Sequence, residues 1–336
     1  MAGGICIAVL GAGSWGTALG VLLARHGHRV RLWGHDPEAV ARLRREGENR
    51  TFLPGVPLPA GLEPVAELEA ALDGADEILI AVPSHAFLEV LERIAEIQPR
   101  PETLAWATKG LEPHGKRLLH EAAAERFPSA RLAVLSGPTF AMEVARGLPT
   151  AVTVAATDVE HAHRLAGCLH GDTFRAYTTD DMVGVQVGGA AKNVMAIAAG
   201  ISDGLGFGAN ARAALITRGL AEITRLGLAL GGRPETFMGL AGLGDLVLTC
   251  TDDQSRNRRM GLALAEGRSL EAACNAIGQE VEGVAAARDF RHLAQEQRVE
   301  MPITEAVYQV LFEGLAPEAA VHALLSRHPK EERESL

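Results

Sequence analysis

The chain has 336 residues, with 32 basic and 42 acidic side chains and a formal net charge of −10 at pH 7. That length exceeds one ordinary domain and suits two. The acidic balance argues against a nucleic-acid-binding protein, because there is no basic surplus to neutralise a phosphate backbone. A few local cations must therefore hold any small anionic ligand.

Neither a membrane span nor a targeting segment is expected. No apolar run reaches the ~20 residues that a span needs, and the first apolar strand begins too close to the first residue for a signal peptide. The four cysteines show no C-x-x-C spacing, so we expect reduced thiols. These features predict a cytoplasmic protein, and no metal site is predicted.

The first motif is Gly-Ala-Gly-Ser-Trp-Gly at 11–16, which follows an apolar run at 5–10 and leads into a helix-like segment at 17–24. A strand, a glycine turn and a helix in this order favour a dinucleotide site over a merely structural turn. Gly11 permits the sharp turn, Gly13 lets a pyrophosphate approach the backbone, and Gly16 lets helix and strand pack closely. The N–H groups of the first helical turn would then face the phosphate oxygens.

A second strand is predicted at 29–33, followed by Gly-His-Asp-Pro. Asp36 stands where an acid can bind the adenosine ribose of NAD. Followed by Pro37, it is also a strong helix N-cap, and this is the interpretation we favour. His35 would then face the ribose and could pair with a 2′-phosphate. The sequence therefore predicts use of NADPH, alongside or in place of NADH.

Prolines and glycines make residues 50–64 loop-like. Beyond them, apolar runs alternate with helical segments; the runs are 77–82, 103–107 and 132–135, and the helices are 87–97 and 116–127. This alternation predicts a parallel sheet covered on both faces, with ligands outside the carboxyl ends of its strands. The residues that fall at such ends, and that we expect to converge on one crevice, are Gly11, His35, Ser84, Lys109 and Gly137, although Ser84 is not counted among the site residues. The alternative for Lys109 is a solvated loop lysine.

Two further strands are expected at 151–155 and 173–177, after which strand signals stop. The predicted fold class is α/β, a Rossmann-type doubly wound parallel sheet followed by an all-α C-terminal domain. We expect a dinucleotide-binding domain at 1–180, an all-α substrate domain at 181–328 and a charged tail at 329–336. The all-α domain could supply the interface of a homodimer.

Lysine is scarce, since only four of the 32 basic residues are lysines. Lys116 and Lys330 are interpreted as surface charges. Lys192, however, is the single charge in the apolar run 187–200, which predicts a helix inside the protein. Because burial favours the neutral amine, a lysine placed there can exchange a proton with a ligand near pH 7. The alternative is a structural lysine paired with a carboxylate.

A carboxylate is available, because Asp245 is the single charge in the apolar, glycine-rich run 237–250. The densest basic cluster, Ser-Arg-Asn-Arg-Arg at 255–259, follows it closely. Ser255, Arg256 and Asn257 together offer a hydroxyl, a guanidinium fork and an amide, which suits a phosphate group. The ordinary explanation for this cluster is an exposed helix start, which we keep open for Arg258 and Arg259.

Seven motifs in order resemble those of the bacterial NAD(P)-dependent glycerol-3-phosphate dehydrogenases. They are Gly-Ala-Gly-Ser-Trp-Gly at 11–16, Trp-Gly-His-Asp-Pro at 33–37, Ala-Thr-Lys-Gly-Leu at 107–111, Ser-Gly-Pro-Thr-Phe-Ala at 136–141, Gly-Ala-Ala-Lys-Asn-Val at 189–194, Ala-Gly-Leu-Gly-Asp-Leu at 241–246 and Ser-Arg-Asn-Arg-Arg at 255–259. The resemblance covers essentially the whole chain. It implies reversible reduction of dihydroxyacetone phosphate to sn-glycerol 3-phosphate, a phospholipid precursor, with NADPH or NADH.

The resemblance also implies residue roles. Lys192 would donate and accept the proton at the substrate oxygen, with Asp245 beside it. The other residues expected to line the substrate are Lys109, Gly137, Thr139, Ser255, Arg256 and Asn257, with Asn193 and Thr249 as additional neighbours. Those expected to contact the cofactor outside the three glycines are Ser14, Trp15, His35, Lys109, Ala141, Arg256, Glu280 and Glu282. Glu280 stands where an apolar residue is expected, so only a backbone contact is predicted there.

Two other functions fit parts of the sequence. A β-hydroxyacid or 6-phosphogluconate-type dehydrogenase would share the architecture and a helical lysine, but the Ser-Arg-Asn-Arg-Arg cluster disfavours it. A nicotinamide-sensing protein without turnover would have no use for Lys192 and Asp245 as isolated buried charges.

Overall fold

The computed structural model describes residues 4–113 and 117–327, which form two compact units. The first unit consists of the chain up to Lys109 together with Leu119–Met182, and the second consists of Gly110–Leu118 and the chain from Val183. The sequence places the division after residue 180 and does not anticipate that 110–118 joins the second unit. The predicted tail at 329–336, Lys116 and Lys330 lie outside the described residues.

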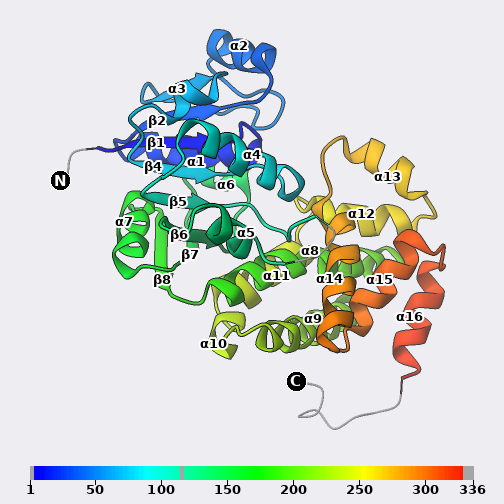
Figure 1. Cartoon of the computed structure of the whole chain (residues 1–336). Coiled ribbons are helices and arrows are strands. Elements are labelled where there is room, and N and C mark those ends of the chain that lie inside the picture. Colours follow the sequence, from blue (N-terminus) through cyan, green and yellow to red (C-terminus); the bar gives the residue numbers. More distant parts are fainter. Residues whose placement is uncertain (1–3, 114–116, 328–336) are drawn as a thin grey trace. The chain divides into compact units, whose positions relative to one another are not determined.

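The first unit is built on an eight-stranded sheet with the order β3-β2-β1-β4-β5-β6-β7-β8 (Figure 1). Its strands are β1 (Cys6–Leu10), β2 (Arg29–Trp33), β3 (Leu62–Val65), β4 (Glu77–Ile80), β5 (Thr103–Trp106), β6 (Arg131–Ser136), β7 (Thr150–Ala156) and β8 (Phe174–Thr179). The order 3-2-1-4-5-6 of the first six strands is that of the dinucleotide-binding Rossmann fold.

Two sheet predictions need correction. The strands are not all parallel: β7 pairs antiparallel with β6, and β8 runs parallel to β7. The loop predicted through residue 64 is also too long, because Leu62–Val65 forms the edge strand β3. An edge strand tolerates Pro64, since only one side of the strand hydrogen-bonds to the sheet.

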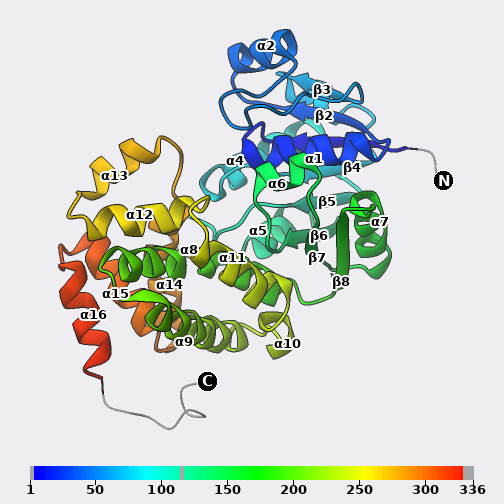
Figure 2. The ribbon, with the colours of Figure 1, turned by 180° about the vertical axis from the view of Figure 1, so that it is seen from behind.

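Helices cover both faces of this sheet. Helices α1 and α6 lie in front of it in Figure 2, whereas α4 and α5 lie in front of it in Figure 1. The helices of the first unit are α1 (Ser14–Arg25), α2 (Pro37–Glu46), α3 (Leu68–Leu72), α4 (Ser84–Ile97), α5 (Leu119–Arg126), α6 (Ala141–Arg146) and α7 (Val159–Leu169). Because both faces are covered, the central strands β1, β4 and β5 are buried along their whole length, whereas β2 and β8 keep partly exposed residues.

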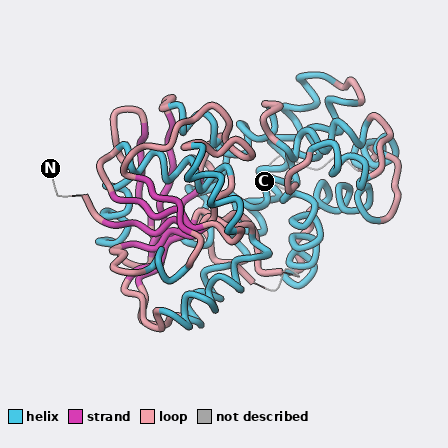
Figure 3. Tube along the Cα trace, turned by 90° about the horizontal axis from the view of Figure 1, so that it is seen from above, coloured by secondary structure: helices cyan, strands magenta, loops and turns pink. Residues whose placement is uncertain are grey.

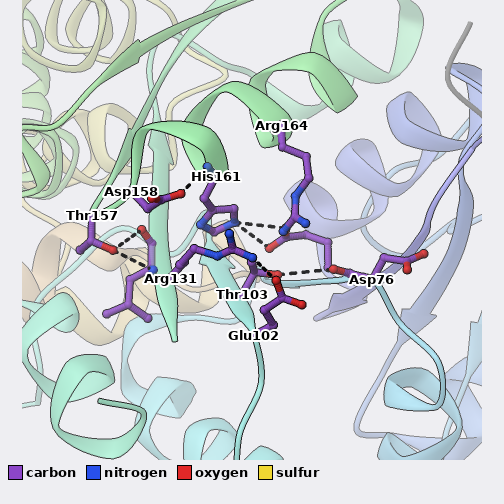
Figure 4. Close-up of polar contacts among 10 residues, drawn as sticks. Asp76, Glu102, Thr103, Arg131, Thr157, Asp158, His161 and Arg164 are labelled. Atoms are coloured by element: carbon purple, nitrogen blue, oxygen red, sulfur yellow. Dashed lines mark hydrogen bonds and ion pairs between the residues drawn. The ribbon is translucent and has the colours of Figure 1, made fainter. Parts of the chain in front are cut away.

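A charged cluster lies at the amino-terminal ends of the central strands (Figure 4). Glu77, the first residue of β4, is 1 % exposed, and both its carboxylate oxygens lie 3.1 Å from Nε2 of His161 on α7. Arg164, one helical turn further along α7, donates to the same carboxylate at 3.2 Å. This buried acid is therefore paired and hydrogen-bonded, which is what its burial requires.

Every regular element in the described part of the second unit is a helix (Figure 3). These elements are α8 (Met182–Gly204), α9 (Gly208–Ala229), α10 (Pro234–Phe237), η1 (Leu240–Gly244), α11 (Asp245–Thr251), α12 (Arg256–Ala265), α13 (Leu270–Ile277), α14 (Glu282–Gln297), α15 (Pro302–Phe312) and α16 (Pro317–Leu325). Helix α8 is long and apolar enough to cross a membrane, but 94 % of that stretch is buried inside the protein. It is the central helix of the core.

Glycines let neighbouring backbones approach α8 closely. A Cβ added at Gly200 would lie 2.1 Å from the carbonyl oxygen of Arg258, and one added at Gly261 would lie 2.1 Å from that of Ile197. At Gly188 an added Cβ would meet the carbonyl oxygen of Ala241 at 2.6 Å. Helix α12 and the segment η1 thus lie against α8 with backbone in contact, where any side chain would separate them.

Candidate functional site

The glycine turn between β1 and α1 has the geometry that a bound pyrophosphate needs. Gly11 has φ +126°, and a Cβ there would lie 2.7 Å from the carbonyl oxygen of Ala81. At Gly16 a Cβ would lie 1.9 Å from the carbonyl oxygen of Gly11, so helix and turn pack without a side chain. At Gly13 a Cβ would meet nothing within 4 Å, which leaves an open cradle at the start of α1. No described side chain caps α1, and Ser14 and Trp15 form its half-buried first turn. The residues present therefore fit a dinucleotide.

One residue that supports this turn was missed in the sequence analysis. Asn49 is 4 % exposed, and its amide donates to the carbonyl oxygen of Ala12 at 2.9 Å and to the hydroxyl of Thr17 at 2.8 Å. Its own carbonyl accepts from the N–H of Phe52. Asn49 therefore fixes both the turn and the helix that follows. The only sequence signal is an asparagine before a Pro/Gly-rich loop, which is too common to identify it.

The segment after β2 confirms the cap interpretation of Asp36. Its carboxylate accepts from the N–H of Glu38 at 2.9 Å, and Pro37 is the first residue of α2. His35, between the strand and this cap, is exposed. Its imidazole is accessible to a ligand at the carboxyl end of β2.

Two neighbouring strand ends bring predicted site residues together. Lys109 follows β5, and its ammonium donates to the carbonyl oxygen of Gly137, which follows β6, at 3.3 Å. Thr139 donates its hydroxyl to the same carbonyl oxygen at 3.2 Å. Ala141 then begins α6 and is half-buried. Lys109 is thus bonded across strand ends rather than being a solvated loop lysine.

In the second unit, Lys192 and Asp245 form a buried ion pair. Lys192 on α8 is 6 % exposed, and its ammonium donates to Oδ1 of Asp245, the fully buried first residue of α11. Thr249, one turn along α11, donates its hydroxyl to the main-chain carbonyl of Asp245 at 2.6 Å and lies 3.4 Å from Oδ1. The two isolated charges of the sequence are therefore partners.

Gly188 explains how this pair forms. It lies one helical turn before Lys192 on the same face of α8, and it lets the backbone of η1 approach. The segment η1 is a π-helical turn, a feature frequent at functional sites, and it ends directly before Asp245.

Cys250 nearby is fully buried, and desolvation raises the pKa of its thiol to about 12 despite the opposing charge of Lys192. It is therefore a neutral thiol and no nucleophile.

A network of amides adjoins the pair. Asn257 on α12 donates to Oδ1 of Asn193 at 2.9 Å and accepts from the N–H of Gly283 at 2.8 Å. Asn193 in turn donates to Glu282, the first residue of α14, at 3.1 Å. Asn193 and Asn257 are both buried. The predicted residues Asn257 and Glu282 thus join three helices beside Lys192.

The basic cluster divides into different roles. Ser255 is 4 % exposed and caps α12 by accepting from the N–H of Arg258 at 3.2 Å. Arg256 is half-buried and donates to Gln279 at 3.3 Å. Arg259 is exposed, but Arg258 is 8 % exposed and ion-paired, so the interpretation of Arg258 as an exposed helix start is wrong. The side chain of Glu280, next to Gln279, is exposed.

Comparisons with known proteins agree with this arrangement of motifs. The family model for the N-terminus of NAD-dependent glycerol-3-phosphate dehydrogenase matches residues 6–162, and the model for its C-terminus matches 181–322. The chain belongs to this family. Between them the two matched ranges leave residues 163–180, and together they contain all the predicted site residues.

Individual relatives agree over nearly the full length. The chain is 59 % identical over 330 residues to a glycerol-3-phosphate dehydrogenase (NAD(P)+) of Thioalkalivibrio sulfidiphilus, covering 97 % of this chain and 98 % of the relative. It is 58 % identical to that of Nitrosococcus oceani, with 96 % and 94 % covered. The crystal structure of the Coxiella burnetii glycerol-3-phosphate dehydrogenase is similar with a TM-score of 0.94, 51 % identity, and 96 % and 99 % coverage. The family uses NAD(P), which fits the cradle at Gly13.

Proposed function

We propose that this chain is an NAD(P)-dependent glycerol-3-phosphate dehydrogenase that interconverts dihydroxyacetone phosphate and sn-glycerol 3-phosphate. The observation that carries the proposal is the buried ion pair between Lys192 and Asp245, next to the amides of Asn193 and Asn257. A buried ammonium held by one carboxylate is a suitable proton donor for a substrate oxygen. Family membership supplies the substrate class.

The proposed chemistry assigns each residue a task. When bound, NAD(P)H supplies a hydride to the carbonyl carbon. Lys192 then donates a proton to the oxygen, and its positive charge stabilises the alkoxide as it develops. Asp245 holds the ammonium in place for the transfer. In the oxidative direction Lys192 accepts the proton from the C2 hydroxyl.

The remaining predicted residues bind substrate and cofactor. We propose that the Arg256 guanidinium binds the phosphate, helped by Ser255 and Asn257, and that Lys109, Gly137 and Thr139 line the substrate. For the cofactor we propose contacts at the glycine turn with Ser14 and Trp15. The other proposed cofactor contacts are His35, Lys109, Ala141, Arg256, Glu280 through its backbone, and Glu282.

An absorbance assay of nicotinamide oxidation with dihydroxyacetone phosphate tests the reaction, and Arg256→Ala tests the phosphate contact. We expect the variant to raise the KM for dihydroxyacetone phosphate by about tenfold or more, because a charge-assisted bond to a phosphate is lost. Arg259→Ala, which removes an exposed arginine of the same helix, is the matched control and should keep the KM. An unchanged KM in Arg256→Ala would refute the phosphate contact.

The cofactor preference depends on His35 in this proposal. Its exposed imidazole after β2 could pair with the 2′-phosphate of NADPH, so His35→Ala should lower the NADPH to NADH ratio of kcat/KM by about threefold to tenfold. Steady-state kinetics with both cofactors measure this ratio. The same ratio in variant and wild type would show that His35 does not bind the 2′-phosphate.

The same assay separates this function from the two rivals. A β-hydroxyacid-type dehydrogenase would oxidise a hydroxy acid and leave dihydroxyacetone phosphate unused, and a sensing protein would turn over neither.

We further propose that the enzyme acts in the cytoplasm and supplies sn-glycerol 3-phosphate to phospholipid synthesis. The homodimer stays a prediction, which analytical ultracentrifugation of the purified chain tests.

A further inference from the structure

Arg258 forms the centre of an ion-pair group at the end of α8, in which the side chains of Arg258 and Asp203 are largely buried and Asp253 is exposed. Its guanidinium donates to Oδ2 of Asp203 in the last turn of α8, and its Nε donates to Asp253 in the loop before α12 at 2.9 Å. Arg212 on α9 donates to the same Oδ2 at 2.6 Å. The side chains of Arg258 and Asp203 are each 10 % exposed. One carboxylate therefore joins three helices.

The three consecutive residues at the start of α12 face different partners. Arg256 reaches Gln279, Asn257 reaches Asn193 beside Lys192, and Arg258 reaches Asp203. The helix geometry of about 100° per residue links these directions rigidly. A rotation of α12 that displaced Arg258 would displace Arg256 and Asn257 as well.

The contact between α12 and α8 includes two places with no side chain between the backbones. It passes through Gly200 and Gly261, where backbone meets backbone, and the carbonyl oxygen of Arg258 itself lies against Gly200. Knobs and grooves of side chains normally fix how one helix sits on another. Here a directional ion pair three residues beyond Gly200 is placed to do so, because the charge-assisted bonds of an arginine fork are specific in geometry.

We propose that Arg258 is a positioning residue for the substrate site. By pairing with Asp203 it holds α12 on α8 so that Asn257 meets Asn193 and the Arg256 guanidinium is presented to the substrate phosphate. This inference rests on the proposed function. The three arginines of the basic cluster then have different roles. Arg256 binds the substrate phosphate, Arg258 positions α12, and Arg259 remains exposed.

The test compares arginine variants in the steady-state assay. Arg258→Met should raise the KM for dihydroxyacetone phosphate by about tenfold or more, since a displacement of about 1 Å at a binding group has effects of this size or larger. The fall in kcat should be smaller than this rise, because the Lys192–Asp245 pair is built on α8 and α11. The Kd for NADPH, measured by fluorescence titration, should not change.

Arg212→Met is the matched control. It also removes one partner of Asp203, but from α9, which carries no proposed site residue. Both variants should lower the thermal unfolding midpoint, and only Arg258→Met should raise the KM. Equal KM increases in the two variants would overturn the inference, because the effect would then follow from lost stability alone.

Two further arms cover the other outcomes. If Arg258→Met does not fold, Asp203→Asn carries the test: a raised KM supports the inference and a wild-type KM overturns it. Arg258→Lys keeps a charge near Asp203, so its KM should lie between that of the wild type and the raised KM of Arg258→Met. An inactive wild type would overturn the proposed function and this inference with it, whereas an active wild type with an unchanged KM in Arg258→Met overturns the positioning role alone.

Discussion

Two buried charge groups, one in each unit, differ in what surrounds them. In the second unit Lys192 pairs with Asp245, beside amides that link α8, α12 and α14. In the first unit Glu77 pairs with His161 and Arg164, at the amino-terminal ends of parallel strands. Ligands of such sheets bind at the opposite, carboxyl ends.

The group around Glu77 has a structural role. His161 Nε2 faces both oxygens of Glu77, while its Nδ1 is buried without a partner among the described residues. These bonds assign the proton to Nε2, because a protonated Nδ1 would leave a buried donor unpaired. Burial of a charge therefore does not by itself mark a catalytic residue. The neighbouring residues, and for a group on the sheet the end of the strands at which it lies, indicate whether a buried charge is catalytic. Variants in both groups can test this distinction.

The largest effect is expected at Lys192. Lys192→Ala should lower kcat by about 10²- to 10⁴-fold, because the proton donor is lost. The Kd for NADPH should stay at the wild-type value, since the glycine turn and its contacts in the first unit are intact. Single-turnover kinetics and a fluorescence titration measure the two quantities. Near-wild-type turnover would remove Lys192 from the mechanism and make its group equivalent to that of Glu77.

The opposite outcome is expected at Glu77. Glu77→Ala should lower the free energy of unfolding by about 3 kcal/mol, because it breaks a buried pair, and should leave kcat and KM unchanged below the unfolding transition. Glu102→Ala is the matched control: this acid lies near the start of the neighbouring strand β5, pairs with Arg131 and is 80 % exposed (Figure 4). Its loss should change the free energy of unfolding by less than about 1 kcal/mol. Urea unfolding measures both, and a loss of turnover in Glu77→Ala would contradict a purely structural role.

The sequence indicates one of these groups and hides the other. Lys192 and Asp245 are each the single charge in a long apolar run, so their burial and their pairing could be predicted. Glu77 stands at the start of an apolar run, where a charge is ordinarily taken as solvent-facing. Its partner His161 is 84 residues away on α7. No local pattern connects the two, because the contact is created by the placement of helix α7 beside the first residue of β4.

Contacts between distant parts of the sequence also explain the other differences between the predicted and the observed structure. Strand identity follows from apolar runs, but the reversal of β7 against β6 depends on pairing that the runs do not encode. Strand β3 was hidden by its neighbouring prolines and glycines, since only an edge position makes Pro64 acceptable. Asn49 has ordinary sequence surroundings, and Arg258 stands in a basic cluster that does not tell it from its neighbours; both gain their importance from residues brought close by the fold.

A third buried carboxylate sharpens the comparison, with an expected effect that shows only as a dependence of stability on pH. Glu222 on α9 is 2 % exposed and accepts from the N–H groups of Ile303 and Thr304 in the first turn of α15, at 2.6 and 3.2 Å. Burial raises the pKa of this carboxyl to about 7, against the lowering effect of both N–H groups and Arg225. Unlike Glu77 and Asp245, it is bonded mainly to backbone.

The sign of the pH dependence follows from this shift. Because the folded pKa lies above the ordinary value of 4.5, the folded chain holds a proton that the unfolded chain has released between pH 4.5 and about 7. The contribution of Glu222 to stability is therefore fully present below pH 4.5 and is lost as the pH rises to about 7, a change of about 3 kcal/mol. Other groups titrate in the same range, so the wild type alone cannot isolate it.

Glu222→Gln provides the reference, because an amide at this position does not titrate. The free energy of unfolding of the wild type minus that of the variant, measured by urea unfolding at several pH values, should fall by about 3 kcal/mol between pH 4.5 and 7 and stay constant above. A difference that does not vary with pH would mean that the N–H groups of α15 offset desolvation. Glu222 would then be an ionised helix cap, satisfied by backbone N–H groups as fully as Glu77 is by His161 and Arg164.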